Sequence, residues 1–190
     1  MTFTFPLRAT VLASAALLAT AAMAQQALVP AQSSIQFSAK QLGVPVSGHF
    51  KQFSAQVQFD TAKPETSKIH FTVDTGSATM GSKETDSNLF SADWFNIAKF
   101  PKATFDSSAV KALGGGKYQI DGTLTIKGQA HKVSVPVQLA QSGTTTTASG
   151  TLPLKRLSFK IGDGDWADTA MVADEVNVQF KLALTGVGKL

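Results

Sequence analysis

The 190-residue sequence contains no cysteine. This absence excludes disulfides, thiolate metal sites, cysteine nucleophiles and a lipidated N-terminal cysteine. Charged residues are also few, at 16% of the chain, whereas hydrophobic residues make up 43%. That balance is typical of a chain with a hydrophobic core rather than of a disordered one, and the length suits one domain. Because disulfides are excluded, the fold must be stabilised by packing.

Arginine is scarce, and the net charge of +4 comes mainly from lysines. Arg156 is the only arginine after Arg8. Nucleic-acid-binding proteins usually cluster Lys and Arg on one face and favour arginine, whose planar guanidinium matches phosphate groups. The lysines of this chain, such as Lys40, Lys68 and Lys111, are spread along the sequence instead. The sequence therefore predicts no nucleic-acid partner.

Long apolar runs are missing as well, since no stretch reaches the roughly 20 residues of a membrane-spanning helix. Near the N-terminus, Arg8 precedes a shorter apolar run, Ala9–Ala22, and Ala22-Met23-Ala24 provides a small-x-small cleavage site. This pattern is typical of a secretory signal peptide. We therefore expect residues 1–24 to be a signal peptide removed after Ala24, and residues 25–190 to be the mature domain in the periplasm.

Common catalytic motifs are not found. The sequence has neither the G-x-S-x-G motif of α/β-hydrolases nor the H-E-x-x-H motif of zinc proteases. Gly115-Gly116-Lys117 is followed by Tyr118 and a predicted strand, whereas a phosphate-binding loop needs Ser or Thr and then a helix. We interpret this run as a hairpin turn and expect no enzymatic activity.

Two weak metal-site patterns remain open as alternatives. His49, His70 and His131 are far apart and lack zinc-motif spacing, although the sequence does not exclude a three-histidine site. The acidic stretch 163–168 resembles a calcium loop, but Asp168 stands where an EF-hand needs glycine. We expect a solvated acidic loop and no metal, with a metal-assisted or stress-related periplasmic module as an alternative function.

Polar and apolar residues alternate through most of the mature chain, as in antiparallel strands with one buried face. The alternation predicts strands over residues 34–40, 53–59, 68–74, 118–126, 131–139, 144–151, 152–161 and 175–182. Ser82–Ser91 breaks this rhythm and is predicted to form a short helix capped by Ser82. About eight strands at short spacing predict an all-β sandwich or barrel.

Phenylalanine is abundant, with 13 residues in the whole chain, and most of them lie on the apolar phase of predicted strands. Such rings either fill an ordinary core or line a cavity, because a barrel of about eight strands encloses only enough space for side chains or one small ligand. Periodicity does not separate these two interpretations.

Several segments match one known family in order and spacing. They are Ser34–Phe37, Gly48–Phe50 with Phe53 and Phe59-Asp60, Asp86–Leu89 running into Ser91–Asn96, Phe100–Phe105, Tyr118–Gly128 and Arg156–Gly162. From about Ser34 to Leu184, the chain resembles the YceI-like family of lipid- and polyisoprenoid-binding proteins. The resemblance implies an extended eight-stranded antiparallel barrel, lipocalin-like in shape, with a short helical insertion and an apolar pore for a polyisoprenoid, a prenyl phosphate or an isoprenoid quinone.

The inward strand positions are the predicted pore wall, namely Phe37, Phe53, Val57, Phe71, Val73, Phe105, Leu154, Phe159, Val178 and Phe180. Trp94, Phe95 and Trp166 are predicted at the mouth, since indole rings suit a boundary between water and apolar surface. Arg156 is the candidate to pair with a phosphate or quinone oxygen, with a surface strand residue as the alternative interpretation.

The expected function is a non-enzymatic periplasmic carrier or store for an isoprenoid lipid or quinone, with no cofactor besides that ligand. An enzyme acting on such lipids is a further alternative, although the sequence offers no convincing titratable pair for the pore. Transient contact with a membrane or membrane protein, and a homodimer, are compatible with this function and stay open.

Overall fold

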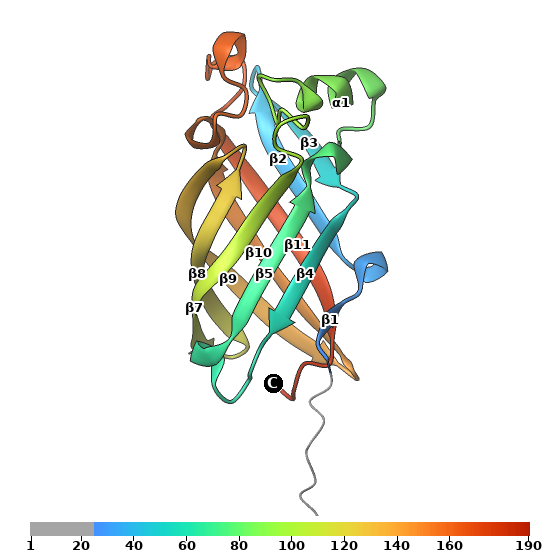
Figure 1. Cartoon of the computed structure of the whole chain (residues 1–190), viewed down its shortest axis with the longest axis vertical. Coiled ribbons are helices and arrows are strands. Elements are labelled where there is room, and N and C mark those ends of the chain that lie inside the picture. The colour runs from blue at the N-terminus through green and yellow to red at the C-terminus, as the bar shows by residue number, and fades with distance from the viewer. Residues whose placement is uncertain (1–24) are drawn as a thin grey trace, which may run out of the picture.

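In the described part of the chain, residues 25–190, eleven strands form one antiparallel sheet that curls around a long axis, as Figure 1 shows for the computed structural model. The predicted signal peptide, residues 1–24, lies outside the described residues. The strands are β1 (Ala27–Leu28), β2 (Ser34–Gln41), β3 (Val44–Phe50), β4 (Phe53–Gln58), β5 (Lys68–Asp74), β6 (Ala78–Thr79), β7 (Lys102–Gly114), β8 (Lys117–Ile126), β9 (Gln129–Ser142), β10 (Thr145–Lys155) and β11 (Glu175–Thr185).

The helices are short. They comprise α1 (Lys83–Phe90) and the 3-10 helices η1 (Pro30–Gln32), η2 (Pro64–Thr66), η3 (Thr75–Ser77), η4 (Arg156–Phe159) and η5 (Gly164–Trp166). The predicted helix over Ser82–Ser91 is confirmed as α1, and the Ser82 hydroxyl accepts a hydrogen bond from the Thr85 N–H at 3.2 Å. Within residues 25–190, no helix combines the length and apolar character needed to cross a membrane.

The two ends of the sheet are joined by two neighbouring paths of the chain, each of which is divided into two short strands. The pairing order is β4-β5-β7-β8-β9-β10-β11-β2-β3-β6, with β1 beside the end of β11. β4 follows β3 after two residues, and β6 follows β5 after η3. β4 pairs with β5, and β3 pairs with β6. The path β3–β4 therefore lies beside the path β5–β6, and the first and last strands of the order belong to these two neighbouring paths. The sheet therefore curls back on itself into a barrel.

The all-β antiparallel prediction is confirmed, but the count of eight strands is wrong. The alternation misses β3, because Pro45 and Gly48 weaken its strand signal. It misses β7, because a bulge between Ser107 and Ala109 shifts the inward phase by one residue. Segments 144–151 and 152–161 are instead one strand, β10, which ends where η4 begins. Since β3 with β4 and β5 with β6 each occupy one position, the wall still has eight positions around its circumference.

Two glycines allow phenylalanine rings to lie against the wall. Gly48 pairs with Phe37 across β2 and β3, and Gly150 pairs with Phe180 across β10 and β11. A Cβ at Gly48 would lie 2.3 Å from Phe37 Cζ, and one at Gly150 would lie 2.6 Å from Phe180 Cζ. Because these positions carry no side chain, the rings cover the neighbouring strand and leave space along the barrel axis.

The buried core is formed mainly by the parts of β7, β8, β9, β10 and β11 that lie towards the C-terminal end of the barrel, the end marked C in Figure 1. It comprises Phe59, Val110, Tyr118, Val135, Val137, Leu139, Ala148 and Leu184. The Gln26 side-chain amide fastens β1 to the end of β4, donating to the Phe59 carbonyl at 2.6 Å and accepting from the Phe59 N–H at 2.7 Å. The Gln141 amide donates to the Gly188 carbonyl at 3.1 Å and holds the last residues over the same end. This end of the barrel is therefore closed.

Candidate ligand-binding cavity

A cavity of about 390 Å³ extends inside the barrel from the closed end to the end that α1 covers. At the closed end it is bounded by Phe59, Tyr118 and Leu184, each of which is less than a tenth exposed. At the opposite end it is bounded by Gln41, Thr85 and Asn88, which are exposed. The cavity therefore has one mouth, and the mouth lies between α1, the β2–β3 hairpin and the β10–β11 loop (Figure 1).

The wall of the cavity is almost entirely apolar. Among the described residues, it contains no Asp, Glu, Lys or His, and Arg156 is its single ionisable cation. The inward phases of β2, β5, β7, β8, β10 and β11 supply Phe, Ile, Leu, Val and Ala side chains. Burial against such a wall favours hydrocarbon, and the described lining residues include no Asp, Glu, Lys or His for general acid–base chemistry.

A carboxylate holds α1 at the mouth. The Thr79 hydroxyl and the Met80 N–H, on the segment that leads into α1, both donate to the Asp86 carboxylate at 2.7 Å. These two hydrogen bonds, the Thr79 hydroxyl first, lower the pKa of Asp86 below its ordinary value. They fix the helix so that Thr85, Asn88 and Leu89 face the cavity.

Arg156 organises the β10–β11 loop by donating to main-chain carbonyls. Its Nε donates to the Ala173 carbonyl, Nη1 to those of Ile161 and Gly162, and Nη2 to those of Trp166 and Val172. A guanidinium has five N–H groups, so every donor is engaged. The side chain is 3% exposed, and burial lowers the pKa of Arg156, an effect that the nearby Asp174 partly offsets.

The alternative interpretation of Arg156 as a surface strand residue is wrong, because the residue is 3% exposed and begins η4. Arg156 lines the cavity, and its pairing with a ligand head group stays a prediction. A guanidinium saturated by five carbonyls gathers residues 156–174 around one point, and head-group binding would break hydrogen bonds that the loop needs. Sequence alone gives no sign of this, since the acceptors are main-chain atoms.

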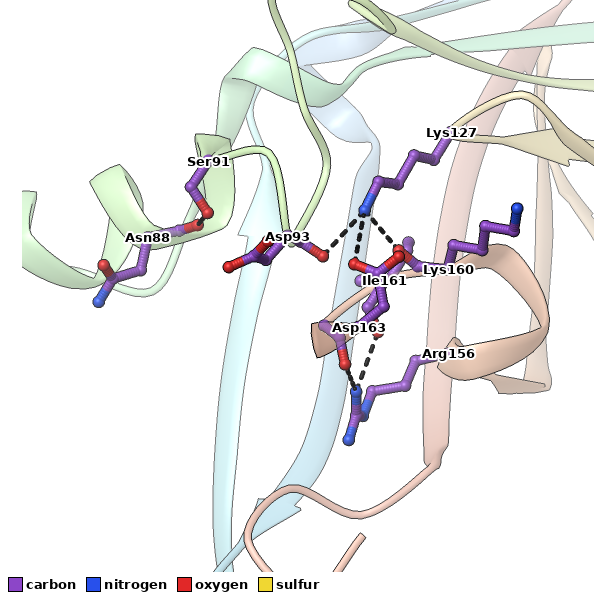
Figure 2. A network of polar contacts seen from close by, with 9 residues as sticks. Asn88, Ser91, Asp93, Lys127, Arg156, Lys160, Ile161 and Asp163 are labelled. Atoms are coloured by element: carbon purple, nitrogen blue, oxygen red, sulfur yellow. Dashed lines mark hydrogen bonds and ion pairs between the residues drawn. The ribbon is translucent and has the colours of Figure 1, made fainter. Parts of the chain in front are cut away.

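Lys127 joins the loops at the mouth to one another, as Figure 2 shows. Its Nζ donates to the Asp93 carbonyl at 2.9 Å, to the Lys160 carbonyl, and to the Asp163 carboxylate at 3.2 Å. Lys127 is 7% exposed, so the ammonium group is withdrawn from water and its three donors are all used. The β8–β9 turn, the segment after α1 and the β10–β11 loop are thereby held as one rim.

Two tryptophans meet beneath this rim. The rings of Trp94 and Trp166 pack edge to face at 5.7 Å, and the Arg156 guanidinium lies 5.9 Å from the Trp94 ring. Among the described residues, the Trp94 indole nitrogen is the one buried side-chain polar atom without a hydrogen-bond partner. An unpaired buried donor costs about 1–3 kcal/mol.

All but one of the predicted site residues line the cavity. These are Phe37, Val57, Phe71, Val73, Trp94, Phe95, Phe105, Leu154, Arg156, Phe159, Trp166, Val178 and Phe180. The exception is Phe53, which does not line the cavity and stacks on Phe71 at 6.0 Å between ring centroids. Ligand contact by these residues stays a prediction.

Several lining residues escape the sequence prediction. Val176 and Leu182 share the phase of Val178 and were available from the same alternation. Thr85 and Asn88 are polar helix residues, and no periodic signal places them at the mouth of a barrel. Only the packing of α1 over the open end brings them there.

The metal-site alternatives gain no support from the described residues, which contain no cluster of three or more His, Asp or Glu side chains suited to a metal ion. In the acidic loop, Asp163 faces Lys127, and the Asp168 carboxylate accepts from the Ala170 N–H at 2.8 Å. His70 instead pairs with Asp106 on the outer surface, at 2.6 Å.

Comparison with known proteins places this chain in a family. Residues 27–184 match the family model described as the YceI-like domain. A UPF0312 protein of Shewanella oneidensis is 31% identical over 168 residues, which cover 84% of each chain. A UPF0312 protein of Shewanella baltica is 36% identical over 114 residues, and this match spans 60% of both chains.

Solved structures with the same fold include BcnA of Burkholderia cenocepacia, with a TM-score of 0.80 and 46% identity over 82% of this chain and 98% of that one. A YCEI protein of Campylobacter jejuni gives a TM-score of 0.67 and 25% identity over 73% and 83% of the two chains. A structure described as a polyisoprenoid binding domain from Saccharophagus degradans gives 0.66 at 18% identity, over 85% and 98%, a likeness of fold alone.

Proposed function

Because this chain belongs to the YceI-like domain family, we propose that it is a binding protein that carries or stores an amphiphilic isoprenoid lipid in its cavity, without catalysing a reaction. The observation that carries the proposal is an apolar cavity with one closed end and one polar mouth. That shape matches a molecule with a long hydrocarbon tail and a small polar head. The predicted signal peptide supports a periplasmic setting for the carrier.

The cavity is large enough for a substantial tail. An apolar cavity of about 150 Å³ holds one benzene molecule, with six carbons. On that scale, the 390 Å³ of this cavity accommodate about 15 carbons with the walls as they stand. At about 0.8 kcal/mol per buried methylene, such a tail contributes roughly 12 kcal/mol before the cost of association. The tail therefore provides the affinity.

The mouth favours an uncharged head group. The only cation in the described lining, Arg156, has all its donors bonded to carbonyls. Gln41, Thr85 and Asn88 instead supply amide and hydroxyl groups. We propose that the buried, unpaired N–H of Trp94, another lining residue, donates to the ligand oxygen. These groups suit the carbonyl of a quinone or the hydroxyl of a prenol better than the charge of a prenyl phosphate, which a free arginine would bind more strongly. We therefore favour an isoprenoid quinone or prenol.

The proposal is tested by narrowing the cavity. Ala103 on β7 lines the cavity, whereas Ala112 on the same strand is exposed. Ala103→Phe adds one ring, which occupies about 150 of the 390 Å³, and Ala112→Phe adds the same ring outside. Both tryptophans of the chain line the cavity, so their fluorescence reports binding of a prenol or quinone.

Ala103→Phe is expected to weaken binding of a 15-carbon prenol at least a hundredfold, while Ala112→Phe binds like the wild type. A 15-carbon prenol should also bind more tightly than its phosphate. Equal affinity in all three proteins would show that the ligand binds elsewhere, and preference for the phosphate would contradict the uncharged head group.

A further inference from the structure

The tip of the β2–β3 hairpin contains a leucine in an unfavourable backbone conformation. Leu42 has φ of 49° and Gly43 has φ of 79°, so both central residues of this two-residue turn have positive φ. Such turns favour Asn or Asp before glycine, because a larger L-residue is strained in the left-handed region. Leucine at this position is costly for the turn.

The other non-glycine residues with positive φ have a visible reason for it. Among the described residues these are Asn96, Lys127 and Lys160. Asparagine tolerates the left-handed region. Lys127 places its buried ammonium group in the rim, and the Lys160 carbonyl is one of the acceptors of that group. Leu42 alone of the four projects an apolar side chain into water, with 71% of the residue exposed.

Leu42 is accompanied by two more exposed apolar residues. Val44 is 62% exposed and Met171 is 42% exposed. The Leu42 N–H donates to the Met171 carbonyl at 2.8 Å, which joins the hairpin to the β10–β11 loop. We name Leu42, Val44 and Met171 the apolar tip. An exposed leucine that also strains its turn gives the folded protein nothing, and such local conflicts mark functional positions.

The apolar tip adjoins the mouth of the cavity. Gln41, which pairs with Val44, lines the mouth, and so does Val172, which bridges to Gln41. Figure 1 shows the β2–β3 hairpin, α1 and the β10–β11 loop at the same end of the barrel. If the apolar tip contacts a surface outside the protein, the mouth of the cavity therefore faces that same surface.

We propose that the apolar tip docks on a lipid bilayer and brings the mouth against the membrane, where cargo enters and leaves. This inference rests on the proposed function, because only a lipid cargo has to cross between bilayer and cavity. A tail that moves directly from membrane to mouth avoids exposure to water.

The size of the tip favours a bilayer over a protein partner. The three side chains expose on the order of 300 Å², within the range of functional patches on monomeric proteins. A stable protein interface buries about 1,200 Å² or more in total, so the tip alone is too small for one. Lys40 and Asp168 flank the tip with opposite charges. Shallow insertion of the tip into a bilayer is driven by burial of its apolar area, to which this balanced charge adds little.

The test uses Leu42→Asn with Leu113→Asn as the matched control. Leu113 is 62% exposed, lies in the β7–β8 hairpin at the closed end and does not line the cavity. The full chain and both variants are mixed with phosphatidylcholine vesicles that contain a prenylated quinone. Three quantities are measured: protein that sediments with vesicles, the rate of quinone transfer to acceptor vesicles, and binding of a short prenol added from solution. Melting temperature and self-association are recorded in parallel.

We expect Leu42→Asn to lower vesicle binding and the transfer rate about tenfold, to leave prenol binding unchanged, and to raise the melting temperature by about 2 °C because asparagine suits the turn. Leu113→Asn should behave like the wild type. Unchanged vesicle binding and transfer in Leu42→Asn would overturn the inference, as would loss of self-association in place of vesicle binding. Failure of every protein to bind the prenol would refute the proposed function instead, while a tip-dependent association with vesicles would still stand.

Discussion

Replacing Arg156 by lysine separates a role in shaping the mouth from a role in binding the head group. Lysine keeps the positive charge but has three N–H donors where the guanidinium has five. At least two of the carbonyls of Ile161, Gly162, Trp166, Val172 and Ala173 would therefore lose their donor. A buried acceptor without a partner costs about 1–3 kcal/mol, so the loop should lose at least 2 kcal/mol of local stability.

The loss should appear in the loop before the barrel, because residues 156–174 lie outside the strands. The Gly162 N–H, bonded to the Asp93 carbonyl, and the Ala173 N–H, bonded to the Lys40 carbonyl, report on the loop. A change of 2 kcal/mol corresponds to roughly thirtyfold faster hydrogen exchange at these amides. Amides of β8 serve as the internal control, because they should exchange at their original rate.

A different result would refute the structural role of Arg156. If Arg156→Lys left loop exchange unchanged and instead weakened binding of a prenyl phosphate or quinone, the guanidinium would be a head-group ligand. Faster loop exchange, together with an unchanged preference among head groups, would establish Arg156 as a positioning residue for Trp166 and the rim of the mouth.

Two further predictions concern the mouth. Trp94→Phe removes the unpaired indole N–H but keeps an aromatic ring, so quinone affinity should fall about threefold to tenfold, the value of one hydrogen bond. Trp166→Phe and an isoprenoid hydrocarbon without a head group are the controls, and equal losses for quinone and hydrocarbon would show that only packing changed. Because the folded-state pKa of Asp86 is lowered, its anchoring of α1 should persist above about pH 4 and be lost as the pH falls further. Hydrogen exchange of the Met80 amide should therefore accelerate, relative to amides of β8, when the wild type is acidified below pH 4. Asp86→Asn should show no such acceleration, and parallel pH profiles in the two proteins would contradict the role of the carboxylate.

The sequence predicted the class of fold and most of the cavity wall for one physical reason. Alternation fixes which face of a strand is inward, so Phe37, Phe71 and Phe180 are assigned to the interior without knowledge of the strand pairing. The phase cannot report a bulge, and β7 was missed for that reason. The alternation also does not show that β3 and β4 share one position in the barrel wall. That arrangement depends on the pairing of β4 with β5 and of β3 with β6.

The polar mouth was less predictable because main-chain atoms build it. Arg156 and Lys127 are held largely by carbonyl groups, which every residue possesses, so their partners leave no trace in the sequence. The short helix was predictable from its capping serine, whereas its position over the cavity depends on Asp86 and the preceding segment. Leu42 could be seen as a leucine before glycine, but its positive φ and exposure required the structure.

The most direct test of the central claim is native mass spectrometry of the protein purified from its own host without detergent. We predict a main species heavier than the bare chain by the mass of one uncharged prenyl lipid, released by organic solvent and absent from Ala103→Phe. A main species with the mass of the bare chain, in folded protein that also fails to take up added prenol, would contradict the claim that the cavity holds a lipid.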